Sequence, residues 1–159
     1  MRLYHGSNVA VEIPKILPRA RALDFGAGFY LTTDFEQAKT WAKLTAFRRK
    51  AGIPTVSVYE VDLNILNCLN LRKFGQADAA WLRYISDNRT NLALPETCDV
   101  IIGPVANDNT MPVINLYLKG DYDEEEALKR LLPYKLKDQY TFRTEKALMA
   151  LEFCEVVEV

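Results

Sequence analysis

The chain has 159 residues, of which 49% are hydrophobic and 26% are charged. This length and composition predict one globular domain, residues 1–159, and they exclude a disordered or fibrous chain. Because 20 Lys and Arg residues stand against 21 Asp and Glu residues, the formal net charge is −1. The balance gives no electrostatic case for binding nucleic acid or an anionic membrane.

The cysteines and the single histidine limit the chemistry further. Cys68, Cys98 and Cys154 form an odd set without CxxC spacing, which is typical of reduced thiols in a cytoplasmic protein. With His5 as its one histidine, the chain gives poor support for a zinc site, and we expect no metal. The N-terminus lacks the apolar segment of a signal peptide, and no apolar run could span a bilayer, so we expect a cytoplasmic protein without membrane contact.

The first third of the chain predicts short elements around one helix. In chain order these are a strand at Arg2–His5, an irregular segment over 8–23, a two-glycine turn at Asp24–Gly28, a strand at Phe29–Thr32 and a helix from Thr33 to about Lys50. Thr33 with Glu36 fits a capping box. The helix is expected to bury an apolar stripe of Phe35, Ala38, Ala42 and Phe47, with Trp41 beside it.

The remainder mixes strands and helices without a regular βαβ rhythm. The β-branched, alternating segment Thr55–Leu63 predicts a central strand, near which a strand at Gln139–Arg143 is expected to pair. The other elements are a short strand at Cys68–Leu71, a helix at Asp78–Ser86, a buried strand at Asp99–Ile102, a segment at Met111–Leu118 that fits strand or helix, a helix capped by Asp121 or Asp123, a short helix at Thr144–Leu151 and a strand at Phe153–Val159. This mixture favours an α+β fold.

Few residues could carry chemistry, and each has a structural alternative. His5 precedes Gly6, whose backbone permits close approach of a ligand, but from its position alone a partly buried structural histidine is the favoured interpretation. Gly26-Ala27-Gly28 does not join a strand to a helix, which excludes a Rossmann site, and a tight turn followed by a core Tyr30 is the alternative. Every Ser–His–Asp arrangement would reuse His5.

Three segments in order resemble the ADP-ribosyltransferases of the poly(ADP-ribose) polymerase and diphtheria toxin class. They are LYHGS at 3–7, GAGFYLT at 26–32 and DQYTF at 138–142, which are similar to the family's L-[WY]-H-G-[ST], G-x-G-[IF]-Y-[FL] and N-E-Y-x-[VF] motifs. More narrowly, the chain resembles a small bacterial family of unassigned function in this superfamily, through LYHGS, DFGxGFYLT, IGPVAND and TEKAL at 3–7, 24–32, 102–108 and 144–148.

The resemblance implies split β-sheets that enclose an NAD cleft, with flanking helices and with NAD as the substrate. It implies that His5 hydrogen-bonds a ribose hydroxyl, that the Gly6 backbone holds the nicotinamide carboxamide and that Ser7 assists. Gly28 belongs to the same NAD-binding set. Tyr30 is expected to stack on the nicotinamide ring, with Trp41 as the second aromatic. Two aromatic faces suit a cationic pyridinium ring.

Gln139 departs from the family, because the catalytic glutamate falls on this position. A carboxylate there would stabilise the positive charge that develops on the ribose when nicotinamide leaves. An amide accepts a hydrogen bond but carries no charge, so Gln139 predicts weaker NAD hydrolysis with NAD binding kept. Strand alternation groups Gln139 with Thr141 and Arg143 on one face and predicts that Tyr140 and Phe142 are buried on the other.

Three functions stay open at this stage. The first is a mono-ADP-ribosyltransferase, a bacterial toxin or effector module that modifies an unknown protein or nucleic-acid acceptor. The second is an inactive module that binds NAD or ADP-ribose. The third is an interaction protein from a two-gene pair of the toxin–antitoxin type, with a neutralising partner. Arg48-Arg49-Lys50 could form a local basic patch, although a solvated helix end is the simpler interpretation.

Overall fold

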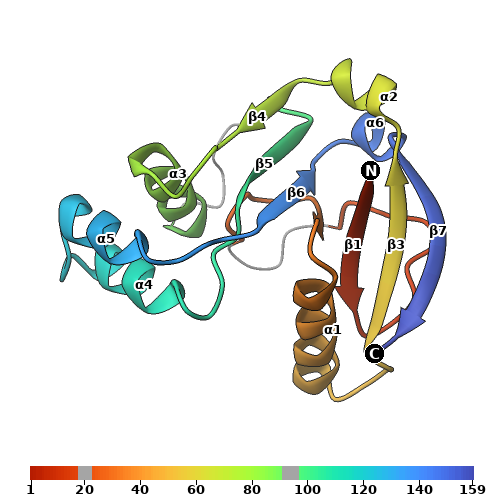
Figure 1. The fold of residues 1–159 in the computed structure, drawn as a ribbon, viewed down its shortest axis with the longest axis horizontal. Coiled ribbons are helices and arrows are strands. Elements are labelled where there is room, and N and C mark those ends of the chain that lie inside the picture. Colours follow the sequence, from red (N-terminus) through yellow and green to blue (C-terminus); the bar gives the residue numbers. More distant parts are fainter. Residues whose placement is uncertain (18–22, 91–96) are drawn as a thin grey trace.

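The computed structural model describes residues 1–17, 23–90 and 97–159. The strands are β1 (Arg2–Ser7), β2 (Phe29–Thr32), β3 (Thr55–Val61), β4 (Leu71–Lys73), β5 (Val100–Pro104), β6 (Asp138–Phe142) and β7 (Leu151–Glu158). The helices are α1 (Phe35–Arg49), α2 (Leu63–Asn67), α3 (Ala79–Thr90), α4 (Met111–Lys119), α5 (Glu124–Leu131) and α6 (Glu145–Leu148). Figure 1 shows these elements, which make an α+β fold.

The strands form one seven-stranded mixed sheet in the order β4-β5-β6-β2-β1-β3-β7. Only β4 and β5 run parallel, and the other neighbours are antiparallel. At its middle the sheet is held by one residue pair, Tyr4 opposite Thr32, whereas the β1–β3 ladder extends over six pairs. The sheet therefore divides into a β1 half (β1, β3 and β7) and a β5 half (β4, β5, β6 and β2).

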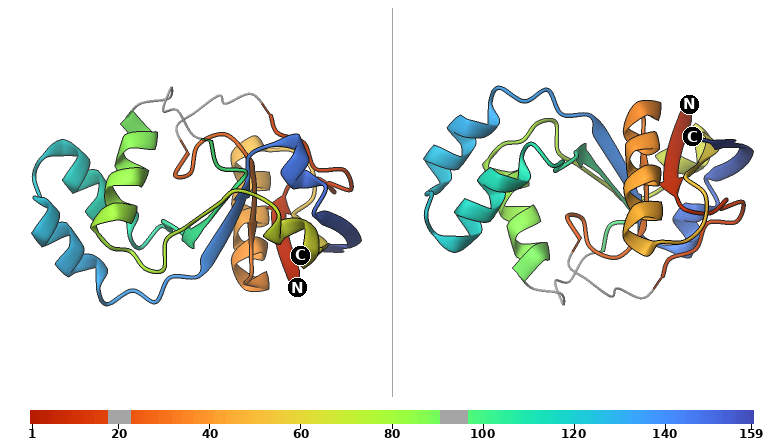
Figure 2. Two further views of the ribbon diagram at one scale, coloured as in Figure 1. Left: turned by 90° about the horizontal axis from the view of Figure 1, so that it is seen from above. Right: turned by 90° about the horizontal axis from the view of Figure 1, so that it is seen from below.

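Helix α1 covers the β1 half at very short range. A Cβ atom added to Gly6 would lie 1.9 Å from the carbonyl oxygen of Ala38. The residues between the helix and the sheet are accordingly small or β-branched, and the buried members are Ala38, Ala42, Val56 and Val58. Figure 2 shows α1 beside β1 in both views.

The β5 half is covered by helices α3, α4 and α5, which gather at the other end of the molecule (Figure 2). Large side chains fill this core, including Phe25, Trp81, Leu82, Ile85, Ile101 and Ile114. The Trp81 indole donates a hydrogen bond to the carbonyl oxygen of Pro104, at 2.8 Å, which ties α3 to the end of β5. Within the described residues, no helix is long and apolar enough to cross a membrane.

Several expected boundaries are corrected. Helix α1 is capped by Asp34, whose Oδ1 accepts the Gln37 N–H at 3.0 Å, and not by Thr33. The strand expected at Thr55–Leu63 ends at Val61, because Asp62 caps the unpredicted helix α2. Cys68 ends that helix, so the short strand expected at Cys68–Leu71 begins only at Leu71, as β4. The ambiguous segment from Met111 is helix α4.

Two tertiary expectations are also wrong. Strand β3 is internal but not central, and β2 and β1 separate it from β6. Phe47, expected in the buried stripe of α1, is 78% exposed, because the helix has passed beyond the sheet at its C-terminal end. Residues 18–22 of the segment expected to be irregular lie outside the described residues.

Candidate functional site

The break in the hydrogen-bonded ladder between β1 and β2, called the opening below, is the first feature of the candidate site. The Val61 N–H donates to the Met1 carbonyl oxygen, so Met1 and Val61 form a hydrogen-bonded pair of the β1–β3 ladder. Such pairs alternate along an antiparallel ladder, which turns the N–H and C=O of Tyr4 and Gly6 away from β3 and toward β2. Because the β1–β2 ladder contains only the pair at Tyr4, the Gly6 peptide faces a place where the ladder has ended.

His5 reaches across this opening. Its Nδ1 lies 2.8 Å from the Tyr30 carbonyl oxygen, and its ring stacks on Phe29 with 4.4 Å between centroids. A carbonyl oxygen can only accept, so Nδ1 carries the proton and donates it. Burial lowers the pKa of His5, and the positive charge of Arg49 lowers it further. The imidazole is therefore neutral near pH 7, and Nε2 is left as a hydrogen-bond acceptor.

Tyr30 is held by the turn that precedes β2. Its hydroxyl donates to the Gly26 carbonyl oxygen at 2.6 Å and accepts the Phe25 N–H at 3.1 Å. Arg143 Nη1 donates to the Phe25 carbonyl oxygen at 2.6 Å and fixes the same turn from β6. Burial, reinforced by the negative charge of Asp24, raises the pKa of Tyr30 above its ordinary value. Tyr30 is thus a neutral hydrogen-bond donor with a fixed ring.

Strand β6 carries two buried polar side chains on the face that Tyr30 shares. Gln139 lies opposite Thr32 and is 2% exposed, and Thr141 lies opposite Tyr30 and is fully buried. Among the described residues, Gln139 Nε2 has no hydrogen-bond partner. Thr141 Oγ1 has none of hydrogen-bond geometry either, although it acts on the Tyr30 pKa. A buried unpaired donor costs about 1–3 kcal/mol, so these two side chains are candidates for contact with a ligand.

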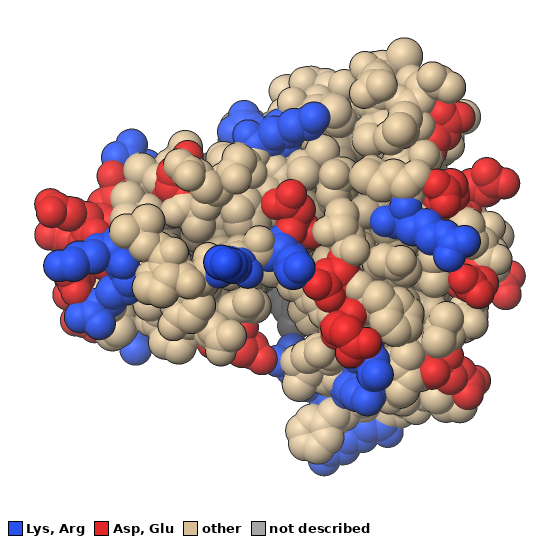
Figure 3. Space-filling view, in the orientation of Figure 1, with Lys and Arg blue, Asp and Glu red and all other residues tan. Residues whose placement is uncertain are grey.

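The N-terminus of α1 borders the same strands. Thr32 Oγ1 donates to Gln37 Oε1 at 2.9 Å and receives the Asp34 N–H at 3.1 Å. The Asp34 carboxylate pairs with Lys137 at 3.3 Å, and the hydrogen bond from the Gln37 N–H holds its pKa below the ordinary value. These contacts fix the start of α1 to the start of β6. Figure 3 shows the surface hollowed between α1 and the end that carries α4 and α5.

The structure joins some of the predicted site residues and separates others. His5 meets Tyr30 through the backbone carbonyl, since alternation along the strands puts their side chains on opposite faces of the sheet. Trp41 is half-buried on α1, directly before Ala42 and about one turn after Ala38, and the backbone of these two alanines packs on Gly6. Ser7 is buried at the end of β1.

The contacts and exposure of Gly28 and of the residues on and after β6 follow from the packing of the sheet. A Cβ on Gly28 would lie 2.6 Å from Thr141 Cγ2, so glycine lets the turn pack on β6. Asp138 is exposed at the start of β6, and its carbonyl oxygen lies 3.2 Å from Thr32 Oγ1, whose single proton is shared between this oxygen and Gln37 Oε1. Glu145 is exposed in the first turn of α6. Tyr140 is only half-buried, contrary to expectation, whereas Gln139 and Thr141 are buried, because helices cover their face of the sheet.

Sequence reasoning missed the residues that support the site. Thr32 is the last residue of the GAGFYLT motif, but the N-cap residue Asp34 and its partner cation Lys137 lie outside every motif. The sequence did contain one signal for the helix start, since Asp34 directly follows Thr33 and is itself a preferred N-cap residue. Nothing local indicated that Lys137 would meet it.

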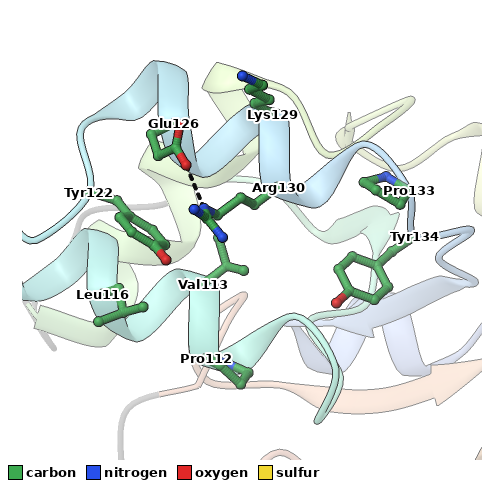
Figure 4. A pocket seen from close by; sticks show the side chains of 9 residues that line it. All are labelled: Pro112, Val113, Leu116, Tyr122, Glu126, Lys129, Arg130, Pro133 and Tyr134. Carbon is green, nitrogen blue, oxygen red and sulfur yellow. Dashed lines mark hydrogen bonds and ion pairs between the residues drawn. The ribbon is translucent and has the colours of Figure 1, made fainter.

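A separate cavity of about 590 Å³ lies between α4 and α5, outside the opening (Figure 4). Arg130 points into it, pairs with Glu126 at 2.5 Å and lies over the Tyr122 ring at 4.7 Å from the centroid. Pro112 and Tyr134 line the opposite wall. None of the predicted site residues lines this cavity.

The site belongs to an α+β protein with a seven-stranded mixed sheet. A family model described as "Protein of unknown function (DUF3990)" matches residues 1–153, and the chain belongs to that family. The comparisons with curated proteins and with solved structures gave no match.

Proposed function

We propose that this chain is an NAD-dependent mono-ADP-ribosyltransferase that acts as a bacterial toxin or effector module. The observation that carries the proposal is the opening between β1 and β2, with the Gly6 peptide turned into it and His5 Nε2 available as an acceptor. The division of the sheet into two halves also agrees with the split sheets that the motif resemblance implies.

In this proposal the chain's polar groups meet complementary groups of NAD. The Gly6 N–H and C=O would pair with the oxygen and nitrogen of the nicotinamide carboxamide. The His5 side chain lies on the other face of the sheet from Tyr30, so His5 Nε2 would accept a hydrogen bond from a ribose hydroxyl only through the opening between β1 and β2, with Ser7 assisting. Tyr30 and Trp41 would hold the pyridinium ring between them, and Gly28 would allow the turn to approach the ligand.

The reaction breaks the bond between C1′ of the ribose and the pyridinium nitrogen. The bonding electrons stay with the nitrogen, which leaves neutral nicotinamide and an oxocarbenium-like ribose. A nucleophilic atom of the acceptor then bonds to C1′ and loses its proton. Gln139 would orient the ribose through its amide, without the charge that a carboxylate supplies.

The first experiment is NAD titration by Trp fluorescence followed by a nicotinamide-release assay. Binding with release supports the transferase, and binding without release supports a second candidate, an inactive module for NAD or ADP-ribose. The neutral Gln139 favours that second candidate. Absence of binding contradicts both. Tyr30→Ala should weaken NAD binding by about 1–3 kcal/mol in a folded variant, as for a lost stacking partner.

Gln139→Glu separates the two candidates more sharply. A negative charge beside the developing cation should raise nicotinamide release by about tenfold or more, since about 1.4 kcal/mol of barrier is tenfold in rate. Burial raises the pKa of a carboxyl placed there, so the gain should grow with pH. Gln139→Ala should lower transferase activity. The matched control is Gln76→Glu on the exposed surface, which should change nothing.

A release rate in Gln139→Glu equal to that of the wild type, with NAD saturation confirmed, would mean that Gln139 is away from the reacting centre.

A further inference from the structure

The C-terminal half of α1 carries an unusual concentration of positive charge. Residues 37–59 contain five basic residues, Lys39, Lys43, Arg48, Arg49 and Lys50, and no acidic residue, in a chain whose net charge is −1. Figure 3 shows Lys and Arg gathered at the lower end of the molecule, where α1 ends in Figure 1. We call Lys43, Phe47, Arg48 and Lys50 the α1 patch.

Three of these five cations have no ion-pair or side-chain hydrogen-bond partner among the described residues. Lys39 pairs with Glu36 at 3.7 Å, and Arg49 donates to Asn8 Oδ1 at 3.0 Å. Within the described residues, no ion pair involves Lys43, Arg48 or Lys50, and all three are exposed. Strand β7 carries Glu152, Glu155 and Glu158, and β3 separates this strand from β1, on which α1 packs.

Phe47 distinguishes this patch from an ordinary solvated helix end. Basic residues in the last turn of α1 complement the helix dipole, which accounts for Arg48 and Arg49. The dipole gives no reason for a phenyl ring that is 78% exposed, the most exposed aromatic side chain among the described residues. An exposed ring on the same helix end as several exposed cations can stack on a base while the cations neutralise phosphates.

We propose that the α1 patch binds single-stranded nucleic acid, with Phe47 stacking on an unpaired base and with Lys43, Arg48 and Lys50 contacting the backbone phosphates. Single strands are favoured over duplexes because a stacked base on Phe47 must be unpaired. The proposal goes beyond the transferase activity and does not depend on it, since it requires no NAD.

The test is fluorescence anisotropy of a labelled oligothymidylate with the full chain in the absence of NAD, at several salt concentrations. Phe47→Ala should weaken binding by about tenfold, within the range measured for a lost stacking contact. Lys43→Gln with Arg48→Gln should reduce the slope of log K against log salt by about 1.4, at about 0.7 per phosphate contact in a single strand.

Matched controls keep the result interpretable. Leu132→Ala removes an apolar side chain that is 80% exposed at the other end of the molecule, and Lys119→Gln with Lys135→Gln removes two exposed cations there. Both controls should bind like the wild type. Circular dichroism of each variant checks the fold. Phe47→Ala should leave the spectrum unchanged, because the Phe47 side chain is exposed.

Four results would overturn the proposal. They are absence of oligothymidylate binding at low salt, equal affinity for duplex and single strand, an unchanged affinity in Phe47→Ala, and binding to vesicles with anionic lipid but not to the oligonucleotide. The last result would assign the patch to a membrane surface instead. Failure of NAD binding or nicotinamide release would leave the α1 patch unaffected and would contradict only the transferase.

Discussion

The two halves of the sheet pack against their helices with side chains of different size. In the β1 half, α1 lies so close to β1 that only a glycine fits at position 6, and the fully buried side chains of the interface are Ala and Val. In the β5 half, large aromatic and aliphatic side chains keep α3 and α4 away from the sheet. Interiors are close-packed, so the first arrangement tolerates no added atom and the second tolerates no removed one.

The difference explains where polar groups can stay unpaired. The β1 and β2 strands separate after Tyr4, where the two halves meet, and Gln139 and Thr141, on β6 of the β5 half, are buried without full hydrogen bonding. We call these two buried side chains the polar seam, and a ligand would supply their missing hydrogen bonds.

The largest effect is expected for truncation in the β5 half. Trp81→Ala should lower the free energy of unfolding by about 3–5 kcal/mol, through the cavity and through loss of the hydrogen bond to the Pro104 carbonyl. Urea unfolding followed by circular dichroism measures it. A loss below about 1 kcal/mol would mean that the α3 core is not close-packed.

In the β1 half, adding an atom to a side chain should be destabilising instead. Gly6→Ala should cost about 3 kcal/mol, because the new Cβ meets the Ala38 backbone, which cannot move without shifting α1. Gly75→Ala is the matched control, since a Cβ there has no neighbour within 4 Å, and its effect should lie within about 0.5 kcal/mol. Equal stabilities of the two variants in thermal unfolding would contradict the close approach of α1.

The cost of the polar seam can be measured by replacing its amide. Gln139→Leu should raise the free energy of unfolding by about 1 kcal/mol, because it removes a buried unpaired donor at similar volume, and it should weaken NAD binding through loss of the proposed ribose contact. Gln76→Leu on the surface should bring no gain. Chemical unfolding and NAD titration of the same samples give both quantities, and a destabilised Gln139→Leu would show that the amide is satisfied in solution.

His5 should make the free energy of unfolding depend on pH, and the sign of this dependence follows from its lowered pKa. Its pKa is lowered in the folded chain, so between that value and about 6.5 the unfolded chain binds more protons. Stability should therefore fall as the pH decreases below about 6.5, with a slope of at most about 1.4 kcal/mol per pH unit. His5→Asn, which can still donate to the Tyr30 carbonyl, should lose this slope between pH 7 and pH 5. Identical pH profiles would place the imidazole in solvent.

Local sequence determined most of the elements. The β2 strand, the helix of residues 124–131 with its Asp123 cap and the strand at Val100–Pro104 follow from side-chain period and capping residues, which act within a few positions. The motifs likewise singled out His5, Gly6 and Tyr30 as candidates. Both kinds of signal are readable because their causes lie within one or two turns of chain.

The tertiary structure alone decided which strands are neighbours and which side chains are buried. Strand β6 joins β2 and β5, far from β3, and the helices that then cover it bury Gln139 and Thr141 while Tyr140 stays half-exposed. Phe47 follows the apolar period of α1 yet reaches solvent, because the sheet ends before the helix does. Strand pairing and the extent of each packed surface depend on contacts between distant segments, which no local period of hydrophobicity records.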